Sequence, residues 1–153
     1  MKTVSCKWAA APLFLGLAIS LSSPVQAEAV HPAKISKADA AGQIFQRPDM
    51  AETEHKDGHR TLDVTSLLSS DGKFASGMYQ SGKTRSEINE PYGVDEFMYF
   101  LEGGVTLTSS DGEVTTISAG EGVTIPKEWT GIWDTDGYTK IWVIYSEDGS
   151  ALE

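Results

Sequence analysis

Short β-prone runs, separated by glycine, aspartate and serine, dominate the sequence from Phe74 onward and constrain its fold more than any other feature. Runs of about four to eight residues rich in apolar and β-branched side chains are typical of strands. No segment after residue 60 keeps the period of an amphipathic helix. The pattern therefore predicts an all-β sandwich or barrel. The predicted strands are Phe74–Tyr79, Glu96–Leu101, Val105–Thr108, Glu113–Ile117, Gly122–Ile125, Gly131–Trp133 and Lys140–Tyr145.

Side chains alternate within these runs, which indicates that each strand buries one face. In a strand, successive side chains point to opposite faces of the sheet. In the run that begins at Glu96, alternation therefore sets Phe97 and Tyr99 on one face and Met98 and Phe100 on the other. Half of these aromatic residues are consequently expected in the core.

The first 27 residues have the pattern of a secretory signal peptide. Lys2 and Lys7 form a positively charged start, an apolar stretch covers 8–21, and Val25-Gln26-Ala27 fits a small-residue cleavage site. The stretch is shorter than the roughly 20 apolar residues that a membrane span needs. We expect cleavage after Ala27 and a periplasmic or secreted protein without a membrane partner. The alternative is an anchoring N-terminal helix.

Charge and cysteine content exclude several function classes. The 153 residues are enough for one domain, with 12 Lys+Arg against 22 Asp+Glu and a formal net charge of −10. This charge disfavours nucleic acid as a partner, because a polyanion would be repelled. The single cysteine, Cys6, lies within the predicted signal peptide, so the mature domain has neither a thiol nucleophile nor a cysteine-ligated metal site. These features favour a small-molecule ligand.

The chain divides into a predicted signal peptide (1–27), a polar leader (28–60) and a β domain (61–148). The leader is expected to be short and mostly irregular, with one short helix possible over 34–46. Residues 61–70 are ambiguous between strand and turn. His55 and His59 have the i, i+4 spacing of a helical metal site. Their polar, glycine-containing context favours a flexible loop instead.

Two spaced motifs in the β region resemble the conserved motifs of the cupins, a superfamily of small jelly-roll barrels. The segment 96–103 matches the Glu-x6-Gly half of the first motif, and 120–126 matches the Gly-x5-Pro start of the second. The aromatic segment 126–133 and the Phe-x-Ser-Gly segment 74–77 are similar to those of the branch that includes (S)-ureidoglycine aminohydrolase and the ethanolamine-utilisation cupins. The resemblance covers 60–147 and implies a single cupin jelly-roll barrel, also called a double-stranded β-helix.

The sequence departs from the cupin pattern at the metal ligands. A metal-binding cupin uses three histidines and one glutamate, and the corresponding positions here are Glu90, Tyr92, Glu96 and Gly131. A first-row metal ion prefers imidazole or several converging carboxylates. We therefore expect no cofactor, and a tightly bound divalent metal is disfavoured.

Residues around the two motifs suggest a ligand site in the mouth of the barrel. Glu96 is the candidate catalytic acid/base, because the resemblance places it facing inward. Carboxylates beside aromatic walls favour a cation or an amide-bearing ligand. Each candidate also has a structural alternative: a solvated loop charge for Glu90, a bond to backbone or tyrosine for Glu96, and core packing for the aromatic residues. The candidate ligand contacts are Glu90, Tyr92, Tyr99, Trp129 and Trp133.

Three functions are compatible with this sequence. The first is an exported cupin that binds a small polar, nitrogenous ligand in the barrel without the usual three-histidine metal site. The second is an enzyme similar to (S)-ureidoglycine aminohydrolase that acts on a small ureide or amine, with Glu96 as acid/base or ligand. The third is a structural jelly roll that forms a homodimer and thereby shields its edge strands. The missing histidines favour the first, although fold alone cannot choose among them.

Overall fold

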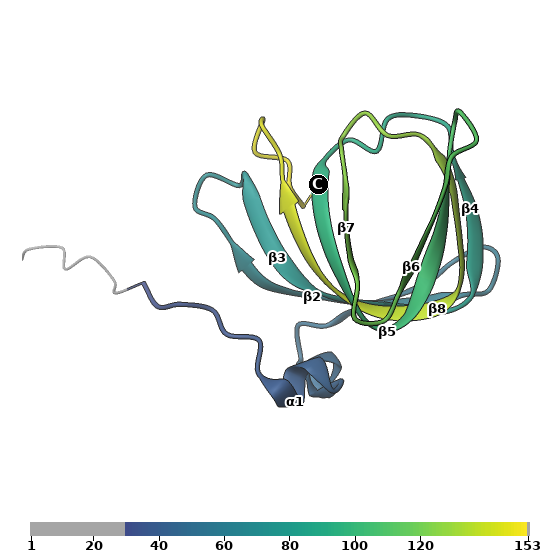
Figure 1. Cartoon of the computed structure of the whole chain (residues 1–153). Coiled ribbons are helices and arrows are strands. Elements are labelled where there is room, and N and C mark those ends of the chain that lie inside the picture. Colours follow the sequence, from purple (N-terminus) through teal and green to yellow (C-terminus); the bar gives the residue numbers. More distant parts are fainter. Residues whose placement is uncertain (1–29, 153) are drawn as a thin grey trace, which may run out of the picture. The chain divides into compact units, whose positions relative to one another are not determined.

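Eight strands in one antiparallel sheet make up most of the structure, a computed structural model that describes residues 30–152 (Figure 1). Their order in the sheet is β1-β2-β3-β8-β5-β6, with β4 also paired to β8 and β7 to β5. The predicted all-β single barrel is confirmed. The strands are β1 (Ala51–Glu54), β2 (Arg60–Leu68), β3 (Phe74–Ser81), β4 (Thr84–Ile88), β5 (Asp95–Ser109), β6 (Val114–Ser118), β7 (Gly122–Ile125) and β8 (Gly131–Tyr145).

Strands β5 and β8 are each 15 residues long and bend round the barrel instead of ending at their glycines. Gly103 has a φ of 66°, and a Cβ at this position would lie 2.0 Å from the carbonyl oxygen of Gly137. Only glycine fits this close approach of two backbones. The pairing of β5 with β8 also shifts register on both sides of Gly103, as at a β-bulge. Each segment predicted as two strands is therefore one bent strand.

Two strands lack the pattern that the sequence prediction used. All four residues of β1 are exposed, and β4 is exposed except at its two ends. Neither strand buries an alternating apolar face, so neither has the periodicity of a half-buried strand. The segment 61–70, ambiguous in sequence, is mostly strand β2.

The segment 35–50 packs against the outside of the sheet. It contains a one-turn helix, α1 (Lys37–Ala40), and a 3-10 turn, η1 (Gln43–Gln46), which Figure 1 shows below the strands. Gly42 separates them with a φ of 100°, so the single helix expected over 34–46 is interrupted. Ile44 is 2% exposed and packs with Val64 and Met78.

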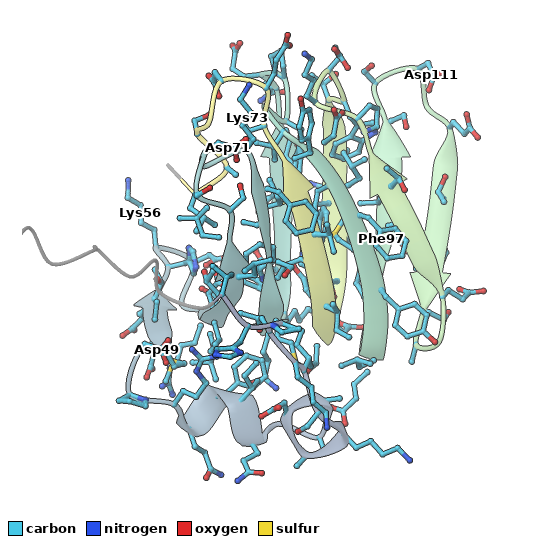
Figure 2. The ribbon with its side chains drawn as sticks, turned by 90° about the vertical axis from the view of Figure 1, so that its left-hand side faces the viewer. Asp49, Lys56, Asp71, Lys73, Phe97 and Asp111 are labelled. Carbon is cyan, nitrogen blue, oxygen red and sulfur yellow. The ribbon has the colours of Figure 1, made fainter. Side chains whose placement is uncertain are left out.

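Alternation along β5 separates an inner face from an outer face, as predicted. Met98 and Phe100 are completely buried, whereas Phe97 and Tyr99 are 44% and 38% exposed. Figure 2 shows Phe97 on the outer face. Glu96 shares the parity of Met98 and Phe100 and is also buried. The start of β5 therefore presents one carboxylate to the inside of the barrel.

The N-terminal sequence predicts a signal peptide, with an anchoring helix as the alternative. The predicted signal peptide, residues 1–27 with Cys6, lies outside the described residues. Within residues 30–152, no helix is both long enough and apolar enough to cross a membrane.

Candidate functional site

A buried ion pair joins the two long strands on the inner face of the barrel. Lys140 Nζ on β8 lies 2.7 Å from Glu96 Oε1 on β5, and the side chains are 6% and 5% exposed. Lys140 is opposite Phe100 in the β5–β8 register. Since Phe100 and Glu96 are four residues apart, both positions face inward. A buried carboxylate requires such a partner, because an uncompensated charge in a low-dielectric interior is costly.

Tyr92 provides the second hydrogen-bond partner of this carboxylate. Its hydroxyl donates a hydrogen bond to Glu96 Oε2, the oxygen that Lys140 leaves free. Burial raises the pKa of the Tyr92 phenol well above its usual value, and the negative charge of Glu96 raises it further. The phenol therefore remains protonated and acts as a donor, so both carboxylate oxygens have a partner.

Aromatic rings surround the Lys140 ammonium. Its Nζ lies 5.4 Å from the ring centroid of Trp133, 5.5 Å from that of Tyr79 and 5.9 Å from that of Tyr138. These distances are within the range of cation–π attraction, which is stronger when the cation is desolvated. Nζ also approaches Met98 Sδ at 2.9 Å. The rings and Glu96 together stabilise a positive charge at this point.

This cluster forms part of the wall of an open cavity of about 390 Å³ in the barrel. Asp63 provides a second carboxylate there, and it accepts a hydrogen bond of 3.2 Å from Trp142 Nε1. Burial raises the pKa of Asp63 above its usual value. The cavity thus combines carboxylate acceptors, one ammonium donor and aromatic walls, the mixture typical of small-molecule sites.

The turn between β1 and β2 contributes two histidines to the same cavity. The rings of His55 and His59 stack in parallel with their centroids 4.1 Å apart. His55 Nε2 lies 2.9 Å from Thr61 Oγ1, and His59 Nδ1 pairs with Asp57. The hydrogen bond with His59 is the main reason that the pKa of Asp57 falls to about 2. The i, i+4 pair therefore lies in a turn instead of a helix.

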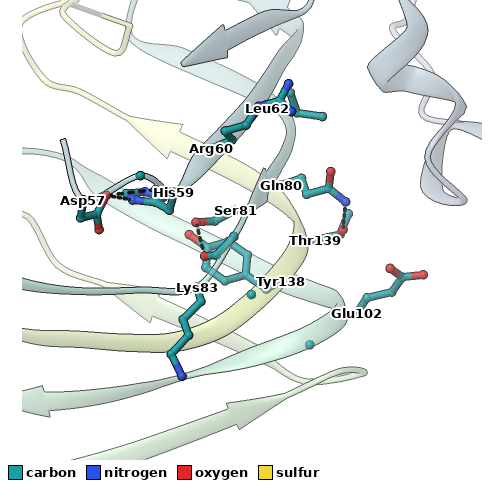
Figure 3. A pocket seen from close by; sticks show the side chains of 14 residues that line it. Asp57, His59, Arg60, Leu62, Gln80, Ser81, Lys83, Glu102, Tyr138 and Thr139 are labelled. Atoms are coloured by element: carbon teal, nitrogen blue, oxygen red, sulfur yellow. Dashed lines mark hydrogen bonds and ion pairs between the residues drawn. The ribbon is translucent and has the colours of Figure 1, made fainter. Parts of the chain in front are cut away.

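A second groove, of about 800 Å³, shares His59, Ser81 and Tyr138 with the cavity (Figure 3). Three of its charged groups, Asp57, Arg60 and Lys83, already have charged partners. Lys83 lies 2.7 Å from Asp136, and both of these side chains are largely exposed. Exposed pairs of this kind interact weakly because water screens them. The buried cluster at Lys140 is therefore the better candidate for specific recognition.

The structure brings three of the predicted site residues to the cavity. They are Tyr92, Glu96 and Trp133. Glu90 is exposed in the loop before β5 and does not line the cavity. Tyr99 faces outward because it is three residues from Glu96, an odd spacing in a strand. Trp129 packs edge-on against Tyr92, with centroids 6.3 Å apart, and is partly buried against the core.

Sequence reasoning did not select Lys140, although a signal was present. Lys140 is the one charged residue in the otherwise apolar run 140–145. Alternation places it on the same face as Trp142 and Ile144, and all three line the cavity. A lysine on the buried face of a central strand requires an acidic partner. Asp63, Tyr79 and Tyr138 carried no comparable signal, because they come from strands that are distant in sequence.

The donor set does not fit a metal centre. Within residues 30–152, no three histidine, cysteine, aspartate or glutamate side chains gather closely enough to hold a metal ion. Glu96, which the cupin resemblance places among the metal ligands, is instead bound to the ammonium of Lys140 and the hydroxyl of Tyr92. A lysine ammonium thus provides the positive charge next to this carboxylate.

Comparison with known proteins places the fold among the cupins. Residues 68–140 match the EutQ-like cupin domain. A Pseudomonas syringae pv. tomato protein of unknown function from the DUF861 family is 14% identical, with a TM-score of 0.56 over 62% of this chain and 43% of that one. This chain therefore spans less than half of that protein.

Two further solved structures share the fold. The EutQ protein of Clostridium difficile is 21% identical, with a TM-score of 0.51 over 63% of this chain and 75% of that one. Ectoine synthase from P. lautus is 18% identical, with a TM-score of 0.54 over 71% and 77%. No curated protein sequence matches significantly. At these identities, the likeness concerns the fold alone.

Proposed function

We propose that this barrel, whose residues 68–140 match the EutQ-like cupin domain, binds one small polar, nitrogen-containing ligand beside the Glu96–Lys140 pair, without a metal ion. The observation that carries the proposal is the 390 Å³ cavity with this buried pair in its wall. Cavities of this size suit small ligands, and a few fixed polar groups in an apolar wall orient them.

The donors and acceptors of the cavity define the ligand. An ammonium has three N–H groups, and the carboxylate of Glu96 and the weakly accepting sulfur of Met98 take two of those on Lys140. The third can donate to a carbonyl or carboxylate oxygen. Asp63 can accept from an N–H group, since Trp142 is its one side-chain hydrogen-bond partner among residues 30–152. A ligand that carries both groups, such as an amide, a ureide or an amino acid, satisfies the two sites together.

An enzymatic function like that of (S)-ureidoglycine aminohydrolase is the second candidate. The observation in its favour is the chain of hydrogen bonds from Tyr92 through Glu96 to Lys140. Such a chain can move a proton between the ligand and Glu96, the part that general acid–base catalysis requires. In this case Glu96 serves as acid/base on a small ureide or amine.

The binding function is tested on protein treated with a chelator. We expect at least one of N-carbamoylglycine, glycinamide and ethylamine to raise the melting temperature, since a ligand that binds only the folded state stabilises it by RT ln(1 + [L]/Kd). The chelator itself should leave the melting temperature unchanged. A melting temperature that falls on chelation and recovers with manganese or zinc would show that a metal takes part.

We propose that the protein is exported after cleavage behind Ala27, to the periplasm or the medium. The charged start, the short apolar stretch and Val25-Gln26-Ala27 support this proposal. N-terminal sequencing of the protein recovered from the cell envelope or medium should begin at Glu28. Protein that is folded and retains Met1 would refute it.

A further inference from the structure

We propose that Lys140 captures a small aldehyde or ketone covalently, as an iminium ion inside the barrel. This inference rests on the ligand cavity of the proposed function and adds a reaction to it. Among the described residues that line the cavity, Lys140 is the only one with an amine, and none has a thiol. The six other lysines of the described chain are exposed or partly exposed, whereas Lys140 is buried.

The position of Glu96 answers the main objection to a lysine nucleophile. An ammonium has no free electron pair, so Lys140 must first lose a proton. Glu96 Oε1 is 2.7 Å from Nζ, within hydrogen-bond reach, and can accept that proton. The transfer replaces an ion pair with two neutral groups, which a buried, water-poor setting penalises less than bulk water does.

The reaction balances with the groups present. After the proton moves from Nζ to Glu96, the amine adds to the carbonyl carbon and forms a carbinolamine. The protonated Glu96 then gives its proton to the carbinolamine hydroxyl, which leaves as water while the nitrogen lone pair forms the C=N bond. The products are an iminium ion, one water molecule and the Glu96 carboxylate. One positive charge on nitrogen is present before and after, and no oxidant or reductant is consumed.

The surroundings of Nζ favour this product. The iminium remains cationic, so the rings of Tyr79, Trp133 and Tyr138 continue to attract it at the 5.4 to 5.9 Å measured for the ammonium. The Glu96 carboxylate remains its counter-ion. Tyr92 keeps its proton because burial raises its pKa, and it therefore holds the carboxylate in place through the reaction.

Reductive trapping tests the inference. The intact protein is incubated with limiting acetaldehyde and cyanoborohydride, and the alkylation of each lysine is followed by peptide mass spectrometry. We expect Lys140 to be alkylated at least about tenfold faster than exposed Lys56, since a positioned proton acceptor activates only the buried amine. Labelling of Lys140 at the rate of Lys56 or below it would overturn the inference. The comparison is internal to one sample and needs no variant.

A matched variant identifies the amine. Lys140→Arg keeps the positive charge but removes the primary amine, so the barrel-specific adduct should vanish while Lys56 is labelled as before. Persistence of a specific adduct in this variant would also contradict the inference. If chelator-treated protein binds one of the three panel compounds but Lys140 is not trapped, only the covalent step is wrong. If none of the panel compounds binds and nothing is trapped, the proposed function is wrong as well.

Discussion

Lys140→Met is expected to lower the free energy of unfolding by about 3–5 kcal/mol, the usual effect of removing one partner of a buried ion pair. Methionine fills similar space but leaves the Glu96 carboxylate, 5% exposed, without its counter-ion. Tyr92 alone cannot neutralise the charge, because its hydroxyl donates one hydrogen bond and carries no charge. Denaturant unfolding monitored by tryptophan fluorescence measures the change, with Trp133 and Trp142 in the affected wall.

Lys83→Met is the matched control for this substitution. Lys83 also lies 2.7 Å from a carboxylate, that of Asp136, but the two side chains are 79% and 89% exposed. Exposed pairs contribute about 0–1 kcal/mol, so this variant should unfold close to the wild type. Equal, small losses in both variants would mean that water reaches the Glu96–Lys140 pair and that the barrel wall is not dry.

The sequence predicted the β domain well where strands are half-buried. Alternation placed Met98 and Phe100 opposite Phe97 and Tyr99, and the burial of β5 follows this pattern. It did not predict β1 and β4, because edge strands of exposed residues need no apolar period. Strand β4 pairs with β8, which is remote in sequence, so local sequence does not reveal that pairing. Strand β1 pairs with the neighbouring β2, but its four exposed residues show no apolar alternation.

Glycine residues within the long strands have a different structural role from glycine residues in the turns. Gly103 and Gly137 lie in the gaps between predicted strands, yet they allow β5 and β8 to approach each other and bend without breaking. The distinction depends on the partner strand: a bend needs another backbone close by, whereas a turn needs only a change of direction. A single sequence does not reveal which strands pair, so it cannot distinguish a glycine at a bend from a glycine in a turn.

The sequence predicted three residues of the candidate site, Tyr92, Glu96 and Trp133, but not Lys140. Tyr92 and Glu96 are four residues apart and stand within or beside a recognisable motif. Lys140 is 44 residues further along the chain, and it meets Glu96 because β8 pairs with β5. Without this cation, two acidic residues and aromatic rings suggested an acidic site for a cation or an amide-bearing ligand. The structure instead shows a neutralised pair beside a second carboxylate, Asp63.

Glu96→Gln is expected to weaken ligand binding by at least about tenfold, on the order of 1.4 kcal/mol. The glutamate holds the Lys140 ammonium and the Tyr92 hydroxyl in fixed positions at the cavity wall. Glutamine preserves the shape but loses the charge that orients the ammonium, so the donor offered to the ligand is misplaced. Stability should also fall, because Lys140 then remains buried without a counter-ion.

Glu90→Gln is the control with the same chemical change. Glu90 is exposed and does not line the cavity, so its substitution should leave both binding and stability within about 0.5 kcal/mol of the wild type. A loss of affinity in this variant equal to that in Glu96→Gln would point to a general effect of net charge. The pair of variants therefore separates the local role of Glu96 from long-range electrostatics.

The most direct test is calorimetric titration of chelator-treated wild type, Glu96→Gln and Glu90→Gln with the panel compound that raises the melting temperature most. The titration is made below the melting temperature of each variant, so that only folded protein contributes. Metal-free recognition at the Glu96–Lys140 pair predicts unchanged affinity in Glu90→Gln and at least about tenfold weaker affinity in Glu96→Gln. Equal affinity in all three proteins would contradict it, because the ligand would then bind elsewhere and the buried pair would serve the fold alone.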